Sequence, residues 1–473
     1  MPACEKSAAT QAAGLLYRSK SATGEQLAKW RDLLHAQWRS RREARARLCA
    51  VVVGVLVTAW FVVARISHAR HVPFVPCDAL HQPGRLLVNL TSPLHTHWRP
   101  MADTRCPPLP KYLPALWEIT HGPDRAFPQY QASTFSKEYQ QIAAEPLPRK
   151  TRLAEQAAST FGTASDPIPF LRKRRTHPPT VLVIGDSVDR NGLVQFCQLF
   201  RRNVTISHYH DIRKHPPGPY PADLTKGHGP KFDGWDQRGL MHRCDIPFAD
   251  GSGIAVRVVN GFHYGMDALD EFNTPDHADW HAPGKAEIRI DELIVPAVEQ
   301  LGGTDKIDVV QLHSGMWDLA LFGMQDDKTK WSLTAPLSPE QFAWWQERMR
   351  HTIYHVRQRF PKARLVFRKL HRTDDAVAGT QYITNLYASI GAGWQAFNSR
   401  VHQLRHLQEE VARSEGLPIF DFGHVLEGYQ LFQEKVHPLL VPGGVVYAHN
   451  LVHQLRLALE SRQSWRRGWL WNA

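Results

Sequence analysis

The stretch VLVIGDSVDRNGL, residues 181–193, decides the fold of the chain. Its apolar first part is typical of a buried strand, and it stops at Gly185-Asp186-Ser187 before a sequence that can begin a helix. Such a turn places Ser187 at a helix N-terminus, where backbone N–H groups and the helix dipole face developing negative charge. Ser187 is therefore a candidate nucleophile, but Asp and Ser are also good helix caps. The stretch alone leaves both interpretations open.

Short apolar strands alternate with helical patterns from residue 180 onward. The candidate strands are 180–186, 254–260, 307–314, 363–370 and 417–422. The candidate helices are 288–300, 339–360, 385–414 and 445–459, and another follows Ser187. This alternation predicts a parallel sheet covered by helices on both faces, a three-layer α/β/α domain. Ligands of such sheets bind beyond the carboxyl ends of the strands, where Ser187 is expected.

A nucleophilic serine needs a base, and a candidate lies near the end of the chain. Glu434-x-x-His437 belongs to EKVHPLLVPGG, residues 434–444, between the last strand and the last helix. A spacing of three lets one loop present both side chains to the same pocket, where Glu434 can hold or polarise the imidazole. His437 is therefore the candidate general base, at the sheet edge where Ser187 is expected.

Composition places the chain among globular proteins. It has 473 residues, 43% hydrophobic and 22% charged, which is enough for two or three domains. The net charge is +12, and residues 1–47 hold ten Lys or Arg against four Asp or Glu. Half of the excess positive charge is thus in a short arm, and no basic module with interleaved aromatic residues follows it. This pattern argues against a nucleic-acid-binding protein.

Seventeen uncharged residues, 48–64, follow the basic arm. As a helix they would reach about 25 Å, just short of the ~30 Å hydrocarbon core, which a thin membrane tolerates. Arginines are denser before the segment (39, 41, 42, 45 and 47) than after it (65 and 70), and no cleavage site is evident. This predicts a retained anchor of a type II protein in the Golgi or another secretory membrane, with the later chain in the lumen. A buried core helix or a mitochondrial presequence is the alternative.

Cysteines and sequons fit a lumenal location. Four cysteines lie beyond the apolar segment: Cys77, Cys106, Cys197 and Cys244. An even set fits an oxidising compartment, and sequence order suggests pairing the first two and the last two, one of three possible connectivities. Asn89-Leu-Thr and Asn203-Val-Thr are acceptor sequons for N-glycosylation.

Four regions are expected along the chain. They are a cytosolic basic arm at 1–47, a transmembrane anchor at 48–64, a lumenal stem with a small cysteine-containing subdomain at 65–179, and the α/β domain at 180–473. No Cys/His spacing of a zinc site occurs, and the histidine pairs near residues 95 and 208 lack a third ligand. We therefore expect no bound metal or cofactor.

Three blocks resemble those of the SGNH, or GDSL, hydrolase superfamily: GDSVDRN at 185–191, HSGMWDL at 313–319 and EKVHPLLVPGG at 434–444. The resemblance is to its PC-esterase branch, which includes the trichome-birefringence-like polysaccharide O-acetyltransferases, and a fungal-type membrane-anchored member fits it. It covers residues 77–460 in islands. The stretch 77–108 resembles the small cysteine-rich region that precedes the catalytic domain in that branch. The implied fold is a flavodoxin-like SGNH domain.

The resemblance implies roles for individual residues. Ser187 corresponds to the nucleophile, His437 to the general base, and Glu434 to a carboxylate that is usually Asp. Gly261, in VNGFHYG, corresponds to the oxyanion-hole glycine, whose N–H would act with that of Ser187. His313 stands where similar sequences carry an oxyanion-donating Asn. Five more residues are expected to fix the nucleophile loop or contact substrate: Asp186, Arg190, Asn191, Trp317 and Asp318.

The resemblance implies a membrane-anchored, lumenal serine acyl-ester enzyme that forms an acyl-serine on Ser187. With a sugar hydroxyl as acceptor it is an O-acetyltransferase, and with water it is an acetylesterase; the expected substrate is a polysaccharide or other glycan. An acyl donor such as an acetyl ester is the expected co-substrate. Because a single span cannot transport that donor, a multi-span transporter is the expected partner.

Two alternatives belong to other classes. The departures at His313 and Glu434 motivate a catalytically inactive SGNH-fold protein that serves as a lumenal binding or scaffold protein. A glycosyltransferase is disfavoured, because no Asp-x-Asp metal motif stands at a strand end.

Overall fold

The computed structural model describes residues 24, 28–38, 51–52, 54–55, 58, 78–101, 108–129, 167–172, 175–208, 240–266, 285–329, 335–373, 393–428 and 436–470. The chain divides into two compact units, Met1–Pro76 and Cys77–Ala473. The predicted regions 65–179 and 180–473 both fall largely in the second unit.

The first unit contains a helix over residues 28–38. Within the described part of the chain, we find no helix that combines the length and the hydropathy needed to cross a membrane. The predicted anchor at 48–64 is described only at residues 51, 52, 54, 55 and 58. The anchor therefore lies mostly outside the described residues and stays a prediction.

The second unit is built on a seven-stranded sheet. In spatial order the strands are β4 (Thr205–His208), β5 (Leu240–Pro247), β6 (Ile254–Phe262), β3 (Thr180–Gly185), β7 (Val309–Leu312), β8 (Arg364–Arg368) and β9 (Ile419–Phe420). The five strands from β6 to β9 are parallel, whereas β4 and β5 are antiparallel to their neighbours. The fold is therefore mixed α/β with a mostly parallel central sheet.

The five strands expected from the sequence are the five parallel ones, but the expectation of a wholly parallel sheet is wrong at one edge. Strands β4 and β5 were missed because their sequences do not look like buried strands. β5 reads LMHRCDIP and alternates between buried and half-buried positions toward its end, and Ile206 of β4 is exposed. A sheet edge tolerates this mixture of charge and apolar residues.

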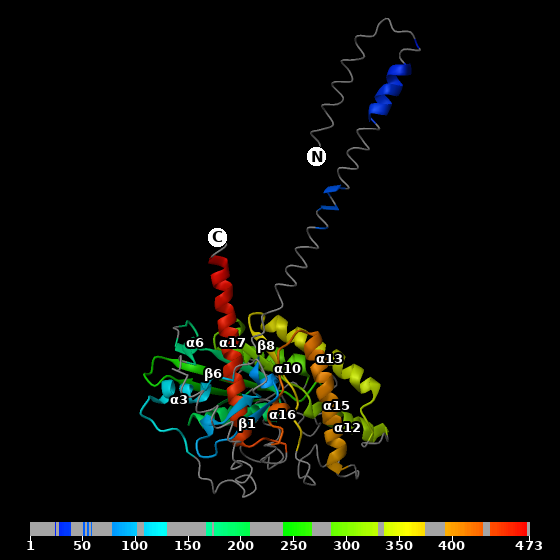
Figure 1. The fold of residues 1–473 in the computed structure, drawn as a ribbon. Helices are drawn as coiled ribbons and strands as arrows, with labels where there is room; N and C mark the ends of the chain where they lie inside the picture. The colour runs from blue at the N-terminus through cyan, green and yellow to red at the C-terminus, as the bar shows by residue number, and fades with distance from the viewer. Residues whose placement is uncertain are drawn as a thin grey trace. The chain divides into compact units, whose positions relative to one another are not determined.

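Helices cover both faces of the sheet (Figure 1). On one face α7 (Ser187–Leu199) packs on β3, β5 and β6, and α17 (Val445–Leu470) packs on α7, β3 and β7. The other face carries a continuous helical segment made of α10 (Ala286–Arg289), η6 (Ile290–Ile294) and α11 (Val295–Gln300). The helix α13 (Pro339–Arg359) packs against α10 and α15 (Gly393–Ser414), and α15 also contacts α12 (Met316–Thr329).

The predicted helices agree with this arrangement, with three differences. Helix α12 was not predicted. The predicted helix 385–414 appears as α15 from residue 393, and residues 385–392 are outside the described residues. Helix α17 continues beyond the predicted end at residue 459 to Leu470.

A segment ahead of the sheet shares its core. It contains η1 (Ala79–His81), the antiparallel strands β1 (Gly84–Leu87) and β2 (His97–Pro100), η2 (Pro93–His95) and α3 (Tyr112–His121). Strand β2 and helix α3 pack against α17, and β1 packs against α16 (Phe422–Val425). A short helix, α6 (Pro169–Arg172), lies against α17 and β6 just before β3.

The disulfide between Cys197 and Cys244 is confirmed, with the two Cα atoms 5.7 Å apart. It joins α7 to β5. Cys77 and Cys106 lie outside the described residues, so their pairing stays a prediction. Asn89 and Asn203 are both exposed, which is compatible with the predicted glycosylation.

Candidate active site

The turn after β3 shows which residue caps α7. Asp186 is the N-cap, and its carboxylate accepts a hydrogen bond from the Val188 N–H at 2.9 Å. Ser187 is the first helical residue, and it is half-buried. Capping therefore falls to Asp186 and leaves the Ser187 hydroxyl for another partner.

That partner is His437, which is 250 residues away in sequence. The Ser187 Oγ lies 2.7 Å from the His437 Nε2, so the hydroxyl can donate to an unprotonated ring nitrogen. His437 is buried and precedes η8 (Leu440–Gly444), the turn that leads into α17. A serine hydroxyl in contact with an imidazole is the arrangement of a nucleophile and its base. Glu434 lies outside the described residues.

A fully buried ion pair involves Asp189, which lies two residues after Ser187 on α7. Arg368, at the end of β8, donates to both carboxylate oxygens of Asp189 on α7, at 2.6 and 2.7 Å. The Tyr447 hydroxyl donates to the same carboxylate at 2.7 Å and accepts from the Gln311 amide, also at 2.7 Å. Burial, and then the neighbouring Asp189, raise the pKa of Tyr447 well above its usual value, so this hydroxyl stays protonated and remains a donor. The network ties α7, β7, β8 and α17 together.

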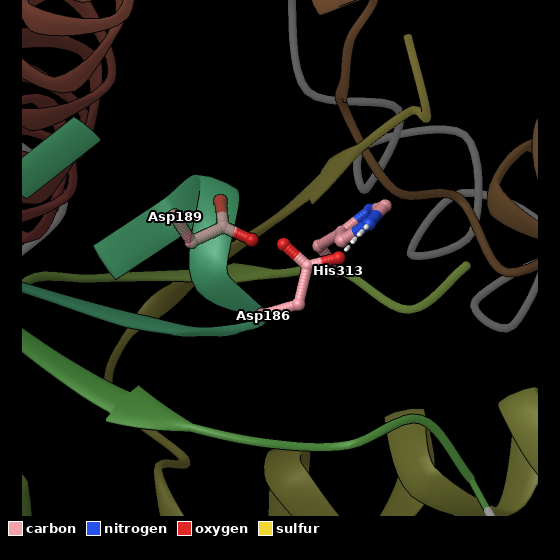
Figure 2. Close-up of side chains that lie close together, drawn as sticks. All are labelled: Asp186, Asp189 and His313. Atoms are coloured by element: carbon pink, nitrogen blue, oxygen red, sulfur yellow. Dashed lines mark ion pairs between the residues drawn. The ribbon is translucent and has the colours of Figure 1, made fainter. Parts of the chain in front are cut away.

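Asp186 and His313 form a second buried contact beside Asp189 (Figure 2). The His313 Nε2 is 3.3 Å from the Asp186 carboxylate, and the Arg368 Nη2 is 3.6 Å from it. Burial alone would raise the pKa of Asp186, but His313 and then Arg368 outweigh it, and the pKa falls well below its usual range. Asp186 is therefore ionised as it caps the helix that begins with Ser187.

Both ring nitrogens of His313 have polar partners. Its Nδ1 lies 2.9 Å from the carbonyl oxygen of Arg368, and its Nε2 faces the ionised Asp186. The two carboxylates Asp186 and Asp189 thus lie beside Arg368 and His313 in one buried cluster. Because both ring nitrogens have these partners, the geometry does not support the expected oxyanion role of His313.

Gly261 lies inside β6, opposite Ile184 of β3 and Met241 of β5. The N–H groups of Arg257 and His263 donate to β3, and by the alternation of the ladder the N–H of Gly261 faces the same way. A Cβ at Gly261 would lie 2.6 Å from the Ile294 side chain. The structure therefore gives Gly261 a packing role in the sheet and does not bring its N–H to Ser187.

Asp318 joins the two loops beside the site. It accepts from the Met266 N–H at 2.7 Å, the Ser314 hydroxyl at 2.6 Å and the Trp345 indole N–H at 2.9 Å. Trp317 lies edge-on to Tyr264, with ring centroids 4.6 Å apart. These contacts fit the expectation that Trp317 and Asp318 hold the loops in place, and none of them involves Ser187.

Arg190 and Asn191 both lie on α7 and are half-buried. The Arg190 guanidinium lies over the Phe262 ring, 5.7 Å from its centroid. The contact is a cation–π interaction between α7 and the end of β6. Asn191 is on the same helix one residue later.

Asp186, Asp189 and His313 are also close enough to be weighed as metal ligands, since one ligand atom of each lies within 4.8 Å of the others. Both oxygens of Asp189 already accept from Arg368, and Asp186 accepts from the Val188 N–H. The guanidinium thus supplies the positive charge that a metal ion would bring, and the cluster is best described as an ion-pair network.

Comparisons with known proteins give only distant similarities. No protein-family model and no curated protein matches the chain. Among solved structures, a protein of Parabacteroides merdae named as a GDSL-like lipase is 11% identical over 61% of this chain and 99% of its own, with a TM-score of 0.28. A peptidoglycan O-acetylesterase is 11% identical over 60% and 92%, with a TM-score of 0.29. Phospholipase A1 of Streptomyces albidoflavus is 14% identical over 57% and 98%, with a TM-score of 0.27. Similarities at these TM-scores establish no family, so the function rests on the residues of this chain.

Sequence reasoning missed four residues that surround the contact: Asp189, Gln195, Arg368 and His371. One signal was present, because Arg368 stands at the end of the apolar run ARLVFRKL. A charge in a strand that is buried on both faces needs a partner of opposite charge. The identity of that partner, 179 residues away, could not be read from spacing.

Proposed function

We propose that the protein is a serine acyl-ester enzyme of SGNH type, with Ser187 as nucleophile and His437 as general base. The single observation that carries the proposal is the 2.7 Å contact between Ser187 Oγ and His437 Nε2 at the carboxyl end of the central parallel strand. Its support lies in the fold around it. A five-strand parallel sheet in the order β6-β3-β7-β8-β9 is the flavodoxin-like arrangement, and ligands bind such sheets at this edge.

The reaction would proceed in two steps. Ser187 Oγ attacks the carbonyl carbon of an ester while its proton passes to His437 Nε2, and the carbonyl oxygen becomes an oxyanion beside the N-terminus of α7. The tetrahedral intermediate collapses to an acyl-serine, and His437 returns the proton to the departing alkoxide. Water or an acceptor hydroxyl then attacks the acyl-serine by the same route and restores the serine.

We further propose that the acyl group is acetyl and that the substrate is a polysaccharide or other glycan. With water as acceptor the protein is an acetylesterase, and with a sugar hydroxyl it is an O-acetyltransferase that takes an acetyl ester as donor. The support is the resemblance of the sequence blocks. A type II anchor in a secretory membrane, a lumenal site and a multi-span donor transporter as partner belong to the same proposal.

Active-site labelling tests the proposed nucleophile. A fluorophosphonate reacts with activated serines, so we expect the purified full-length chain to gain one adduct on Ser187, detected by peptide mass spectrometry. Ser187→Ala removes the adduct, and His437→Ala reduces the labelling rate by about a hundredfold or more, as loss of a general base implies. Incubation with p-nitrophenyl acetate should give an acetyl adduct on the same peptide.

The matched control is Ser314→Ala. Ser314 is a buried serine at the end of β7 whose hydroxyl donates to Asp318, so its loss should leave the adduct on Ser187. Folded wild-type protein that gains no adduct would instead favour the inactive SGNH-fold binding protein. Adding an oligosaccharide acceptor to the acetyl-enzyme separates the two activities, because a transferase moves acetyl to the sugar and an esterase releases acetate.

A further inference from the structure

The segment that carries His437 is held from both sides by buried side chains. The His371 Nε2 lies 2.8 Å from the carbonyl oxygen of Val436, and the Gln195 Nε2 lies 2.9 Å from that of Pro438. His371 is 1% exposed and Gln195 is 8% exposed. The two backbone carbonyls that flank His437 therefore each accept a hydrogen bond from a different element of the fold.

His371 can act as a donor only through Nε2. It is fully buried just after β8, and burial, followed by the charge of Arg368, lowers its pKa to about 3. The neutral ring carries one hydrogen, and because the Val436 carbonyl only accepts, that hydrogen is on Nε2. The contact thus fixes both the tautomer and the orientation of His371.

Gln195 lies on the same helix as Ser187 and hydrogen-bonds to the segment that carries His437. It lies on α7, eight residues after Ser187, or about 12 Å along the helix axis. A Cβ at Gly444, in the turn after His437, would lie 2.5 Å from the Gln195 Oε1, so the turn packs closely on this side chain. Any shift of α7 relative to the His437 segment would break the Gln195 contact.

We propose that His371 and Gln195 are positioning residues that hold His437 in line with Ser187. Their hydrogen bonds go to the carbonyls on either side of His437, so their effect passes through the backbone of residues 436–438. The proposal rests on the proposed function for its effect on rate. We call these two hydrogen bonds the clamp. A displacement of about 1 Å at a reacting group costs on the order of a hundredfold in rate, so loss of the clamp should slow the reaction measurably.

The test uses a pair of substitutions at His371. In His371→Gln the amide nitrogen takes the place of Nε2 and keeps the donor, whereas in His371→Asn it takes the place of Nδ1 and loses it. We expect His371→Asn to lower kcat for p-nitrophenyl acetate, and the rate of fluorophosphonate labelling, by about ten- to a hundredfold, with KM within about twofold. His371→Gln should stay within about threefold of wild type. Gln195→Met, which keeps length without a donor, should behave like His371→Asn.

His449→Asn is the matched control. His449 is also buried, its pKa is also lowered to about 3 by burial, and its Nε2 also lies at a backbone carbonyl, that of Thr96, 3.0 Å away. That carbonyl belongs to the segment ahead of the sheet rather than to the His437 turn. Loss of this contact should lower stability without changing kcat or the labelling rate.

A second readout does not depend on turnover. Diethyl pyrocarbonate modifies accessible imidazoles, and peptide mass spectrometry follows His437 separately from the other histidines. Release of the clamp should raise the modification rate of His437 several-fold in His371→Asn and not in His449→Asn.

Equal modification rates in these two variants, or equal loss of kcat in His371→Asn and His371→Gln, would overturn the clamp. A wild-type protein without esterase activity or labelling, but with faster modification of His437 in His371→Asn, would instead refute the proposed function and keep the clamp.

Discussion

Asp189 is the acceptor at the centre of the buried network next to Ser187. It accepts from the Nε and Nη2 groups of Arg368 and from the Tyr447 hydroxyl, and all three side chains are fully buried. A buried pair adds little net stability compared with apolar residues, because both ions lose their hydration. Removing one partner is a different matter, since it leaves the other charge buried without compensation.

Asp189→Asn therefore tests the network at the scale of one residue. The substitution keeps the shape but removes the close counter-ion of Arg368 and leaves only the more distant Asp186, 3.6 Å away, so we expect the free energy of unfolding to fall by about 3 kcal/mol. Urea denaturation followed by tryptophan fluorescence measures it. Asp305→Asn is the control, because Asp305 pairs with Lys306 at 2.7 Å on the surface, where solvent screens the pair, and its loss should cost far less than that of Asp189. Similar losses in the two variants would contradict the assigned importance of the buried pair.

Single residues also show which contacts of the site can be predicted from the sequence and which cannot. The contact between Ser187 and His437 was predictable because each lies in a short motif with a chemical reason for its spacing. The sequence could not show which residue caps the helix, since both Asp186 and Ser187 are good caps. His371 and Gln195 are isolated polar residues, and their contacts run to carbonyls 65 and 243 residues away. No local pattern encodes such distances.

Helix α7 is the element that combines these contacts. It begins at Ser187, carries Asp189 in its first turn and Gln195 on a later turn, and is tied to β5 through Cys197. Its close packing on α17 depends on Gly192, because a Cβ there would lie 2.6 Å from two ring carbons of Tyr447. The Tyr447 ring cannot easily move aside, since its hydroxyl is held by Asp189.

Gly192→Ala tests this helix contact. Alanine favours a helix over glycine by about 1 kcal/mol, but overpacking against a buried ring costs about 1–3 kcal/mol. We expect a net loss of up to about 2 kcal/mol in the free energy of unfolding, measured by urea denaturation. Gln198→Ala, at an exposed position of the same helix, should change it by less than about 0.5 kcal/mol. A Gly192→Ala variant that is more stable than wild type would contradict the close packing assigned to α7 and α17 at this position.

The sequence predicted elements well where periodicity was strong. Helix α13 lies within one residue of its predicted range, and all five parallel strands were expected. Strand β5 was not predicted because His242, Arg243 and Asp245 interrupt its apolar pattern. Arg243 and Arg257 of the neighbouring strand both pair with Asp245, at 3.2 and 2.7 Å. Cross-strand pairing makes this charged strand stable, and a single strand's sequence does not reveal its partner.

Among the described residues, His263, His371 and His449 are neutral buried histidines that contribute strongly to the pH dependence of folding. Burial is the largest cause that lowers the pKa of His263 to about 4 and those of His371 and His449 to about 3. In the unfolded chain each imidazole titrates near 6.5. Below that pH the unfolded state binds more protons than the folded state, so acid favours unfolding.

We therefore expect stability to fall as pH drops from about 6.5 to about 4. Well below pH 6.5 each of the three imidazoles contributes about 1.4 kcal/mol per pH unit, or roughly 4 kcal/mol per unit together. Urea denaturation at a series of pH values measures the slope. His449→Gln keeps a donor near Thr96 but cannot titrate, so it should reduce the slope by about a third. A free energy of unfolding that is constant between pH 6 and pH 5 would contradict this account.

The contact between Ser187 and His437 spans 250 residues, and this separation has a consequence for the order of events during synthesis. A ribosome makes the serine, its helix and the other six strands of the seven-stranded sheet before it makes the histidine. Throughout that time the growing chain holds the proposed nucleophile without its proposed base. Under the proposed function, a nascent chain should therefore not react with esters until the turn that carries His437 and the helix after it have been made.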